Sequence, residues 1–383
     1  MSAPEELDSP LVLRGLRLVE IHLPLREPFA ISSGVSTVRR IFLLELEHEG
    51  GVRCWSECVA GELPNYSPET IDTAWMAIRE WLAPRVLGRP FGSLAEAAAA
   101  LRHDVRGHLM AQAAIEMGLW GLLATREGLP LSRLLGGVRW SVPVGISLGI
   151  QRDPAALVER ATAALRDGYR KIKLKIKPGQ DIEYVAAVRA ALGPGAPLMA
   201  DANNAYTLAD VEHLARLDEY QLVMIEQPLA WDDVVRHAEL QRRLRTPICL
   251  DESITSVEKA EDMIRLGAGR IVNIKPGRVG GFCPSRAIHD VCAAADVPVW
   301  CGGMLESGVG RAYNVALATL PNFTIAGDIS PSARYWQRDV VSPEWTMDER
   351  GEMTVPTTPG LGVTVDLDRI DDLTVRSETL DAR

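Results

Sequence analysis

After Trp140, short apolar segments alternate with longer amphipathic segments along most of the chain. The apolar segments read VPVGIS, KIKLKI, PLMAD, LVMIE, PICLD, RIVNIK, PVWC and FTIAGD. This alternation is typical of buried parallel strands that are separated by helices, as in βαβ units. Eight such units predict an α/β fold of the (β/α)8 TIM-barrel type.

Start and stop signals support helices between these strands. Asp153 stands before Pro154 as an N-cap before a first-turn proline, and Gly168 ends that helix. The segments 207–210 and 255–258 have the character of capping boxes, the first with Asp in place of Glu. The local signals and the repeat therefore predict the same elements.

The first third of the chain predicts a separate α+β layer. Residues 11–25 and 38–47 alternate as strands do, and a turn precedes a returning strand at 52–59. Helices are expected at about 68–85, 94–104 and 107–125, and the tail contains the alternating run GVTVDLD. We expect the tail to pack on the N-terminal layer. The predicted domains are 1–138 as an α+β capping domain, 139–330 as the catalytic barrel and 331–383 as a returning C-terminal segment.

Composition and charge narrow the classes of partner. A net charge of −10 disfavours a nucleic-acid or anionic membrane surface as the main partner. The start MSAPEELDSP does not resemble a secretory signal, and no apolar run approaches the roughly 20 residues that span a bilayer. We therefore expect a cytoplasmic protein that binds neither nucleic acid nor membranes.

Ionisable residues end five consecutive predicted strands: Lys175, Asp201, Glu226, Asp251 and Lys275. Each follows the one before by 24 to 26 residues, which is one βα unit. Taken singly, each could be a helix N-cap or a surface charge. Five in register, each after an apolar run, indicate a shared site at the C-terminal mouth of a barrel, where catalytic residues converge.

Three carboxylates on adjacent strands form an all-oxygen set, which suits Mg²⁺ or Mn²⁺ better than zinc. The run 171–177 alternates strictly between Lys and Ile or Leu, so a barrel that buries its apolar face on the helices turns Lys173 and Lys175 inward. A lysine close to a cation and a second lysine should have a lowered pKa, which makes it a usable base. A cation that binds a substrate carboxylate would stabilise the enediolate formed when the α-proton leaves.

The motifs KIKLKIKPG, MADANNAYTL, IEQPLAWDD, CLDESI, NIKPGRVGG and WCGGMLESGVGRAYN together resemble the enolase superfamily, muconate-lactonizing subgroup. Within it, the chain is similar to the o-succinylbenzoate synthase and N-succinylamino acid (N-acylamino acid) racemase family. The resemblance extends from PLREPF to DLD. It implies a modified barrel with a capping domain, and an isomerase or lyase that acts on a small carboxylate, including a dehydration step in menaquinone biosynthesis. We also expect a homo-oligomer.

The resemblance implies roles for single residues. Lys175 and Lys275 would be the acid/base pair, and Asp201, Glu226 and Asp251 would bind the metal. The remaining implied substrate-binding residues are Ser147, Lys173, Asn203, Arg278, Gly303, Met304, Phe29 and Tyr66. Arg278 matches a position associated with the racemase branch, whereas Ser33 departs from the aromatic residue that relatives often carry in the capping loop.

Other interpretations stay open or lose ground on single residues. Mandelate-type relatives use a His base late in the barrel, where this sequence has none, and dipeptide epimerases carry Asp-x-Asp where it reads Gly327-Asp328-Ile329. A muconate cycloisomerase stays open. A Schiff-base aldolase would not need three carboxylates. A non-catalytic metal- or ligand-binding barrel would bind metal without exchanging an α-proton.

Overall fold

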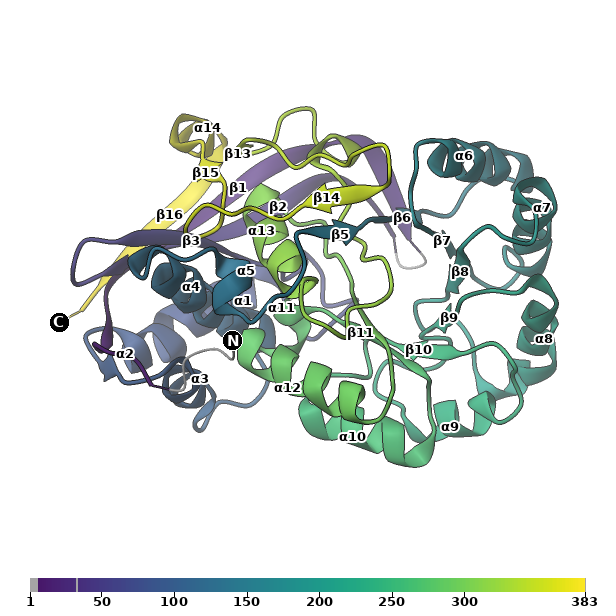
Figure 1. The fold of residues 1–383 in the computed structure, drawn as a ribbon, viewed down its shortest axis with the longest axis horizontal. Coiled ribbons are helices and arrows are strands. Elements are labelled where there is room, and N and C mark those ends of the chain that lie inside the picture. The colour runs from purple at the N-terminus through teal and green to yellow at the C-terminus, as the bar shows by residue number, and fades with distance from the viewer. Residues whose placement is uncertain (1–5, 32–33, 383) are drawn as a thin grey trace.

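The structure is a computed structural model that describes residues 6–31 and 34–382, without the side chains of residues 29–36. An N-terminal layer of sheet and helices lies beside a barrel (Figure 1). The N-terminal sheet has the strand order β16-β1-β2-β3, and β4 pairs with the start of β1. The bounds of these strands are Thr374–Asp381, Leu11–Ile31, Gly34–His48, Arg53–Cys58 and, for β4, Pro90–Phe91.

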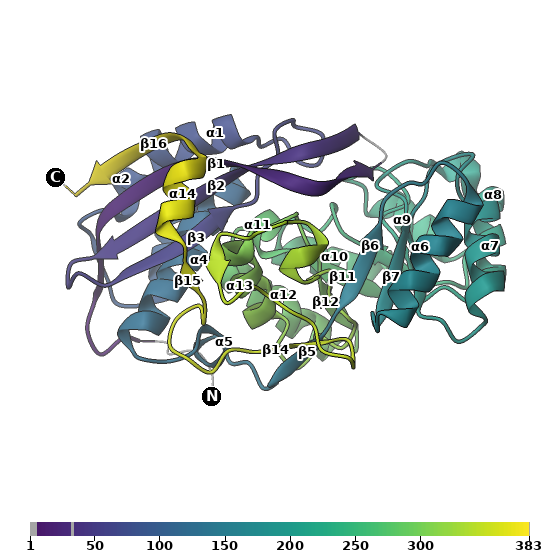
Figure 2. The ribbon, with the colours of Figure 1, turned by 90° about the horizontal axis from the view of Figure 1, so that it is seen from above.

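Helices cover one face of this sheet. They lie close to the predicted ranges: α1 at Ile71–Ala77, η1 at Ile78–Leu82 and α2 at Ala83–Val86 follow one another without a gap, α3 spans Leu94–Arg102, α4 spans Leu109–Arg126, and α5 at Leu131–Leu134 was not predicted. Helix α4 is buried along almost its whole length because it packs between the sheet and the barrel. Figure 2 shows β1 and β2 continuing as a two-stranded arm toward β6 and α6 of the barrel.

The barrel contains a seven-stranded parallel sheet in the order β12-β11-β10-β9-β8-β7-β6. In chain order from β6, its strands are Gly145–Leu148, Lys171–Lys175, Leu198–Asp201, Ile225–Glu226, Ile248–Leu250, Ile271–Ile274 and Val299–Cys301. The eighth predicted strand, FTIAGD, forms isolated bridges instead: Phe323 pairs with Val299, and Gly327 pairs with Val144. The expectation of eight regular strands is corrected here, because this segment closes the barrel through single bridges on each side.

Helices follow the barrel strands, as the alternation predicts. They are α6 at Pro154–Arg166, α7 at Ile182–Leu192, η2 at Leu208–Asp210, α8 at Val211–Ala215, η3 at Arg216–Tyr220, α9 at Val235–Gln241, α10 at Val257–Leu266, α11 at Pro276–Val279, α12 at Phe282–Ala294 and α13 at Gly308–Leu317. The caps at Asp153 and Thr207 are confirmed. The N-cap of α10 is Ser256 rather than Thr255, since the Ser256 side chain accepts from the backbone N–H of Lys259.

The C-terminal segment returns to the N-terminal layer, although not through the predicted run. Strand β14 at Glu352–Thr354 pairs with β5 at Ser141–Pro143. The segment also contains η4 at Ser332–Arg334, β13 at Val341–Ser342, β15 at Thr364–Val365 and α14 at Leu367–Leu373. The run GVTVDLD supplies β15, which pairs with β13, and the start of α14. The return is made by β16, which pairs antiparallel with β1. The domain boundaries themselves stay a prediction.

Buried carboxylates of the N-terminal layer accept hydrogen bonds from the first turns of two barrel helices. Glu116 on α4 accepts from the backbone N–H groups of Phe282 at 2.7 Å and Cys283 at 2.8 Å, where α12 begins. Glu57 on β3 accepts from the backbone N–H groups of Ser307 and Gly310 at the start of α13. These first-turn N–H groups have no partner within their own helix, so the carboxylates fix the barrel to the layer.

Within the part of the chain that the structure describes, no helix is both long enough and apolar enough to cross a membrane.

Glu57 should make stability depend on pH. Burial raises the pKa of Glu57 from an ordinary 4.5 to about 8, and the carboxylate of Glu306 adds to the rise while the Ser307 hydroxyl opposes it. The folded state keeps the proton where the unfolded chain has lost it, so this contribution is full below about pH 4.5 and disappears as the pH rises through about 8. We expect the free energy of unfolding to fall more steeply from pH 5 to pH 8 in the parent than in Glu57→Gln.

Urea unfolding at several pH values measures this difference. The exposed Glu49, replaced by Gln, is the control and should follow the parent curve. Parallel curves for the parent and Glu57→Gln would show that Glu57 ionises normally.

Candidate active site at the barrel mouth

The predicted residues end adjacent strands at one mouth of the barrel. Lys175, Asp201 and Glu226 are the last residues of β7, β8 and β9, and their backbones are paired in register, Lys175 with Asp201 and Asp201 with Glu226. Asp251 and Lys275 directly follow β10 and β11. The parallel register therefore brings all five side chains to one place, as the spacing predicts.

Each carboxylate at this mouth faces a basic side chain. Lys175 Nζ lies 2.6 Å from Asp201 Oδ2, and Lys275 Nζ lies 2.7 Å from Asp251 Oδ2. Lys173 Nζ lies 3.1 Å from both Asp201 Oδ2 and Glu226 Oε2. The lysines of β7 thus point into the barrel, as the strict alternation of this strand predicts.

Burial and charge act against each other on these groups. Burial opposes ionisation of Asp201 and Asp251, but the neighbouring basic groups outweigh burial and lower the pKa of both carboxylates. Glu226 differs, because burial and the carboxylates of Asp201 and Asp251 together raise its pKa well above the ordinary value. The pKa of Lys275 is raised by Asp251 against the effect of burial. The lowered lysine pKa expected from the sequence is therefore not found at Lys275 in this arrangement, because the carboxylates act directly on its ammonium group.

The three carboxylates can be tested as a metal site by their chemistry. As the described side chains stand, no three His, Cys, Asp and Glu residues are grouped closely enough to hold a metal ion. However, the three carboxylates lie near one another. Asp201 and Glu226 both lie 3.1 Å from Lys173 Nζ, and the charges of Asp201 and Asp251 both raise the pKa of Glu226. This all-oxygen set fits a hard divalent cation once the lysines release the carboxylates.

Other predicted residues surround these groups. The amide oxygen of Asn203 accepts from Lys175 Nζ at 2.6 Å. The hydroxyl of Tyr66, from the N-terminal layer, donates to Asp251 Oδ1 at 2.9 Å and accepts from Lys275 Nζ at 3.2 Å. Arg278 binds both Asp251 and the Tyr66 hydroxyl. Arg278 is therefore a buried partner of Asp251 rather than a solvated loop charge.

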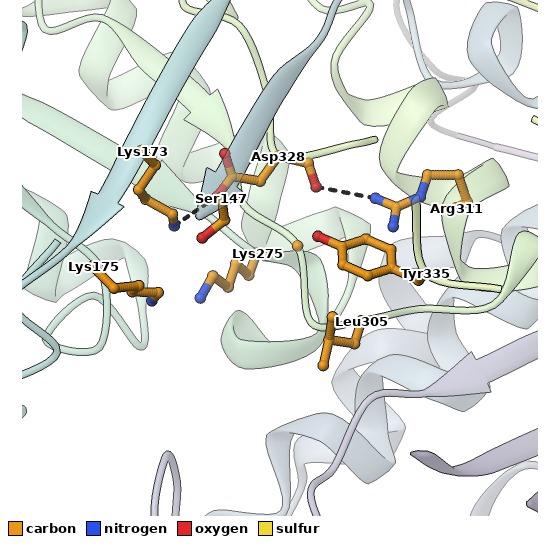
Figure 3. A pocket seen from close by; sticks show the side chains of 9 residues that line it. Ser147, Lys173, Lys175, Lys275, Leu305, Arg311, Asp328 and Tyr335 are labelled. Carbon is orange, nitrogen blue, oxygen red and sulfur yellow. Dashed lines mark hydrogen bonds and ion pairs between the residues drawn. The ribbon is translucent and has the colours of Figure 1, made fainter. Parts of the chain in front are cut away.

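A pocket opens between Lys175 and Lys275, whose ammonium groups point toward each other across it (Figure 3). Among predicted residues, Ser147, Lys173 and Gly303 also line it. Met304 does not appear among its lining residues, and its neighbour Leu305 does. The Phe29 side chain lies outside the described residues, and so does Ser33.

The pocket is also lined by residues for which no role was predicted: Leu305, Arg311, Asp328 and Tyr335. Asp328 Oδ2 lies 2.6 Å from Lys173 Nζ and Oδ1 lies 3.4 Å from Lys171 Nζ, so it neutralises the inner lysines of β7. The position of Asp328 in the sequence indicates a site residue, because Asp328 ends the eighth apolar segment, FTIAGD, just as the predicted site residues end earlier apolar segments.

Asn273 also supports the site. Its side-chain amide donates to Glu226 Oε1 at 2.7 Å from inside the barrel. A local signal for Asn273 is present as well, because this residue interrupts the apolar segment RIVNIK two residues before Lys275 and so points inward with it. Asn273 therefore orients one predicted metal ligand.

A capped (β/α) barrel with acidic and basic groups at its mouth defines the class of protein. Residues 156–369 match the protein family described as "Enolase C-terminal domain-like". Residues 14–136 match the family described as "Mandelate racemase / muconate lactonizing enzyme, N-terminal domain". The chain belongs to the enolase superfamily. The resemblance inferred from the sequence motifs is thereby confirmed.

Relatives align along nearly the whole chain. The chain is 47% identical over 352 residues to an o-succinylbenzoate synthase of Geobacillus kaustophilus, covering 91% of this chain and 92% of that protein. It is 49% identical over 363 residues to an N-succinylamino acid racemase of Thermus thermophilus, covering 94% and 96%. A crystal structure of an enolase superfamily member from Listeria innocua has a TM-score of 0.94 at 39% identity, covering 97% of this chain and 100% of that chain.

Proposed function

We propose that the chain is an enzyme that removes the α-proton of a carboxylate substrate with the help of a divalent cation, Mg²⁺ or Mn²⁺. One observation carries the proposal: Lys175 and Lys275 enter one pocket from strands that are not adjacent, with their ammonium groups toward each other (Figure 3). Two bases on opposite faces of one carbon can remove a proton from one side and return it on the other. A non-catalytic binding barrel has no need of this pair.

Each lysine must be neutral before it can take a proton. At rest, Lys175 faces Asp201 and Lys275 faces Asp251, and both ion pairs are buried. Neutralisation of Asp251 by another cation would remove the attraction that raises the pKa of Lys275. When bound at Asp201, Glu226 and Asp251, a divalent cation supplies positive charge that stabilises the substrate carboxylate while the α-proton leaves.

Lys173 would hold the substrate rather than react with it. Its ammonium group is fixed by Asp201, Glu226 and Asp328, and the pKa of Lys173 is raised well above the ordinary value by these carboxylates despite burial. Asp328 is not a predicted metal ligand, so it keeps Lys173 charged when a cation neutralises Asp201 and Glu226, and a charged lysine can bind a carboxylate but cannot act as a base. Asn203, bound to Lys175, orients that base, and Ser147 and Gly303 line the same pocket.

We propose two substrates for this site, an N-succinylamino acid that is racemised and the cyclohexadiene precursor of o-succinylbenzoate that is dehydrated. The names of the relatives that align along more than nine-tenths of the chain support both substrates. Arg278 and Met304 are kept as proposed substrate-site residues, Arg278 through its contact with Asp251. A homo-oligomeric, cytoplasmic enzyme stays a prediction.

Paired assays with magnesium or manganese test this function. N-succinyl amino acids are followed by polarimetry and by α-proton exchange in deuterium oxide, and the cyclohexadiene precursor is followed by its loss of absorbance. Activity with either substrate supports the proposed chemistry. Metal binding without exchange or dehydration would instead indicate a non-catalytic barrel.

The proposed metal site predicts the behaviour of Glu226→Gln. This substitution keeps the shape of the side chain and removes one ligand charge, so the affinity for Mg²⁺ should fall about tenfold or more, and turnover should fall with it. Titration calorimetry measures the affinity, and Glu239→Gln, at an exposed position on α9, is the control. Unchanged Mg²⁺ affinity in Glu226→Gln would exclude Glu226 as a ligand.

The two lysines should differ in the enantiomer that they serve. In deuterium oxide, Lys275→Ala should exchange the α-proton of the enantiomer whose proton faces Lys175, and Lys175→Ala should show the reverse preference. Neither variant should racemise, because the second face then lacks a base. Proton NMR of each pure enantiomer measures the exchange.

Lys259→Ala is the control for loss of a lysine, because Lys259 lies on α10 rather than at the barrel mouth. It should exchange and racemise like the parent. Racemisation at close to the parental rate in either Lys175→Ala or Lys275→Ala would rule out the two-base mechanism.

A further inference from the structure

Gln227 is held in an unfavourable backbone conformation at the barrel mouth. It follows Glu226 directly, is completely buried and has a φ of 38°. Residues other than glycine adopt this left-handed region at a cost in free energy, so the surrounding contacts must hold the conformation. Those contacts lead to each strand that carries a predicted metal ligand.

The side chain of Gln227 binds the segment that contains Asp251. Its Oε1 atom accepts from the backbone N–H of Asp251 at 3.0 Å and from the backbone N–H of Ser253 at 3.3 Å. Its Nε2 atom donates to Ser253 Oγ at 2.6 Å and to the backbone oxygen of Ala230 at 3.1 Å. The amide therefore acts as donor and acceptor at once, which neither a carboxylate nor an apolar side chain can reproduce.

The backbone of Gln227 binds both neighbouring strand ends. Its N–H donates to the oxygen of Cys249 at 2.9 Å, and its oxygen accepts from the N–H of Asn204 at 2.9 Å. Asn204 lies three residues after Asp201, and Cys249 lies two residues before Asp251. One residue is thus bonded to the segments that carry Asp201, Glu226 and Asp251.

We propose that Gln227 is a positioning residue for the metal site, which sets the spacing of the three carboxylates through these bonds. The inference rests on the proposed function, because it assumes that the three carboxylates bind a cation. Gln227 itself does not touch the cation. Its loss should lower the affinity for metal beyond any effect on folding, since groups that orient ligands commonly contribute about 10–100-fold to metal affinity.

The chain offers a matched control at the other end of β10. Gln241 is also buried, donates to the backbone oxygens of Leu244 and Thr246, and accepts from the N–H of Ile248, where β10 begins. Gln241→Met and Gln227→Met therefore remove the same kind of buried hydrogen bonds, Gln241→Met at the start of β10 and Gln227→Met at the segment that directly follows it. The Gln241 bonds lie at the end of β10 that is far from the metal site, where support for a barrel is structural.

The test measures Mg²⁺ binding by titration calorimetry and stability by urea unfolding in EDTA, both on the full chain. We expect the Kd for Mg²⁺ to rise about tenfold or more in Gln227→Met and to stay within about twofold of the parent in Gln241→Met. The urea midpoint should fall in both variants. Parental affinity in Gln227→Met, or an equal rise in Kd in both variants, would overturn the positioning role.

A milder variant covers the case in which Gln227→Met does not fold. Ser253→Ala removes the hydroxyl that accepts from Gln227 Nε2 and leaves the glutamine in place, and we expect a Kd raised several-fold. An unchanged Kd in Ser253→Ala would also overturn the inference. Failure of the proposed metal site gives a different result, because the parent itself would then bind no Mg²⁺, and a barrel that binds Mg²⁺ without catalysis is identified separately by the exchange and dehydration assays.

Discussion

Charge neutralisation inside the barrel mouth is the constraint on which the site depends. A buried charge without a partner is strongly destabilising, so each ammonium group here lies against a carboxylate. Lys173 is the centre of this network, because it lies within 3.1 Å of Asp201 and Glu226 and 2.6 Å from Asp328. The parallel register places these partners at fixed distances. The same groups that would bind a cation and a substrate therefore neutralise one another's charge in their absence.

The N-terminal layer contributes to this site in two ways. Tyr66 reaches the barrel mouth directly and binds Asp251 and Lys275 through its hydroxyl. Glu57 supports the pocket indirectly. It binds the first turn of α13, and this helix directly follows the segment that contains the pocket residues Gly303 and Leu305. The layer is therefore part of the pocket's support as well as its cover. A barrel alone would leave these helix ends and this acidic group without their partners.

Local sequence patterns predicted part of the structure correctly. They predicted the ends of five strands and the inward lysines of β7 from strand periodicity, and the helix caps at Asp153 and Thr207 from capping residues. Features that depend on tertiary contacts were missed. No local pattern shows that FTIAGD forms bridges rather than a strand, or that Gln227 bonds to both neighbouring strand ends. The pKa of Lys275 without a cation, raised by Asp251 despite burial, likewise depends on which carboxylate lies closest in space.

The pairing of β16 with β1 has a consequence for how the protein forms during synthesis. Strand β1 lies between β2 and β16, so the outer edge of its residues 15–21 lacks this partner until residues 374–381 have left the ribosome. An unpaired edge is a template for pairing with other chains. The entire barrel is made during that interval. The nascent chain must therefore keep this edge from aggregating longer than a protein whose sheet is completed by neighbouring segments.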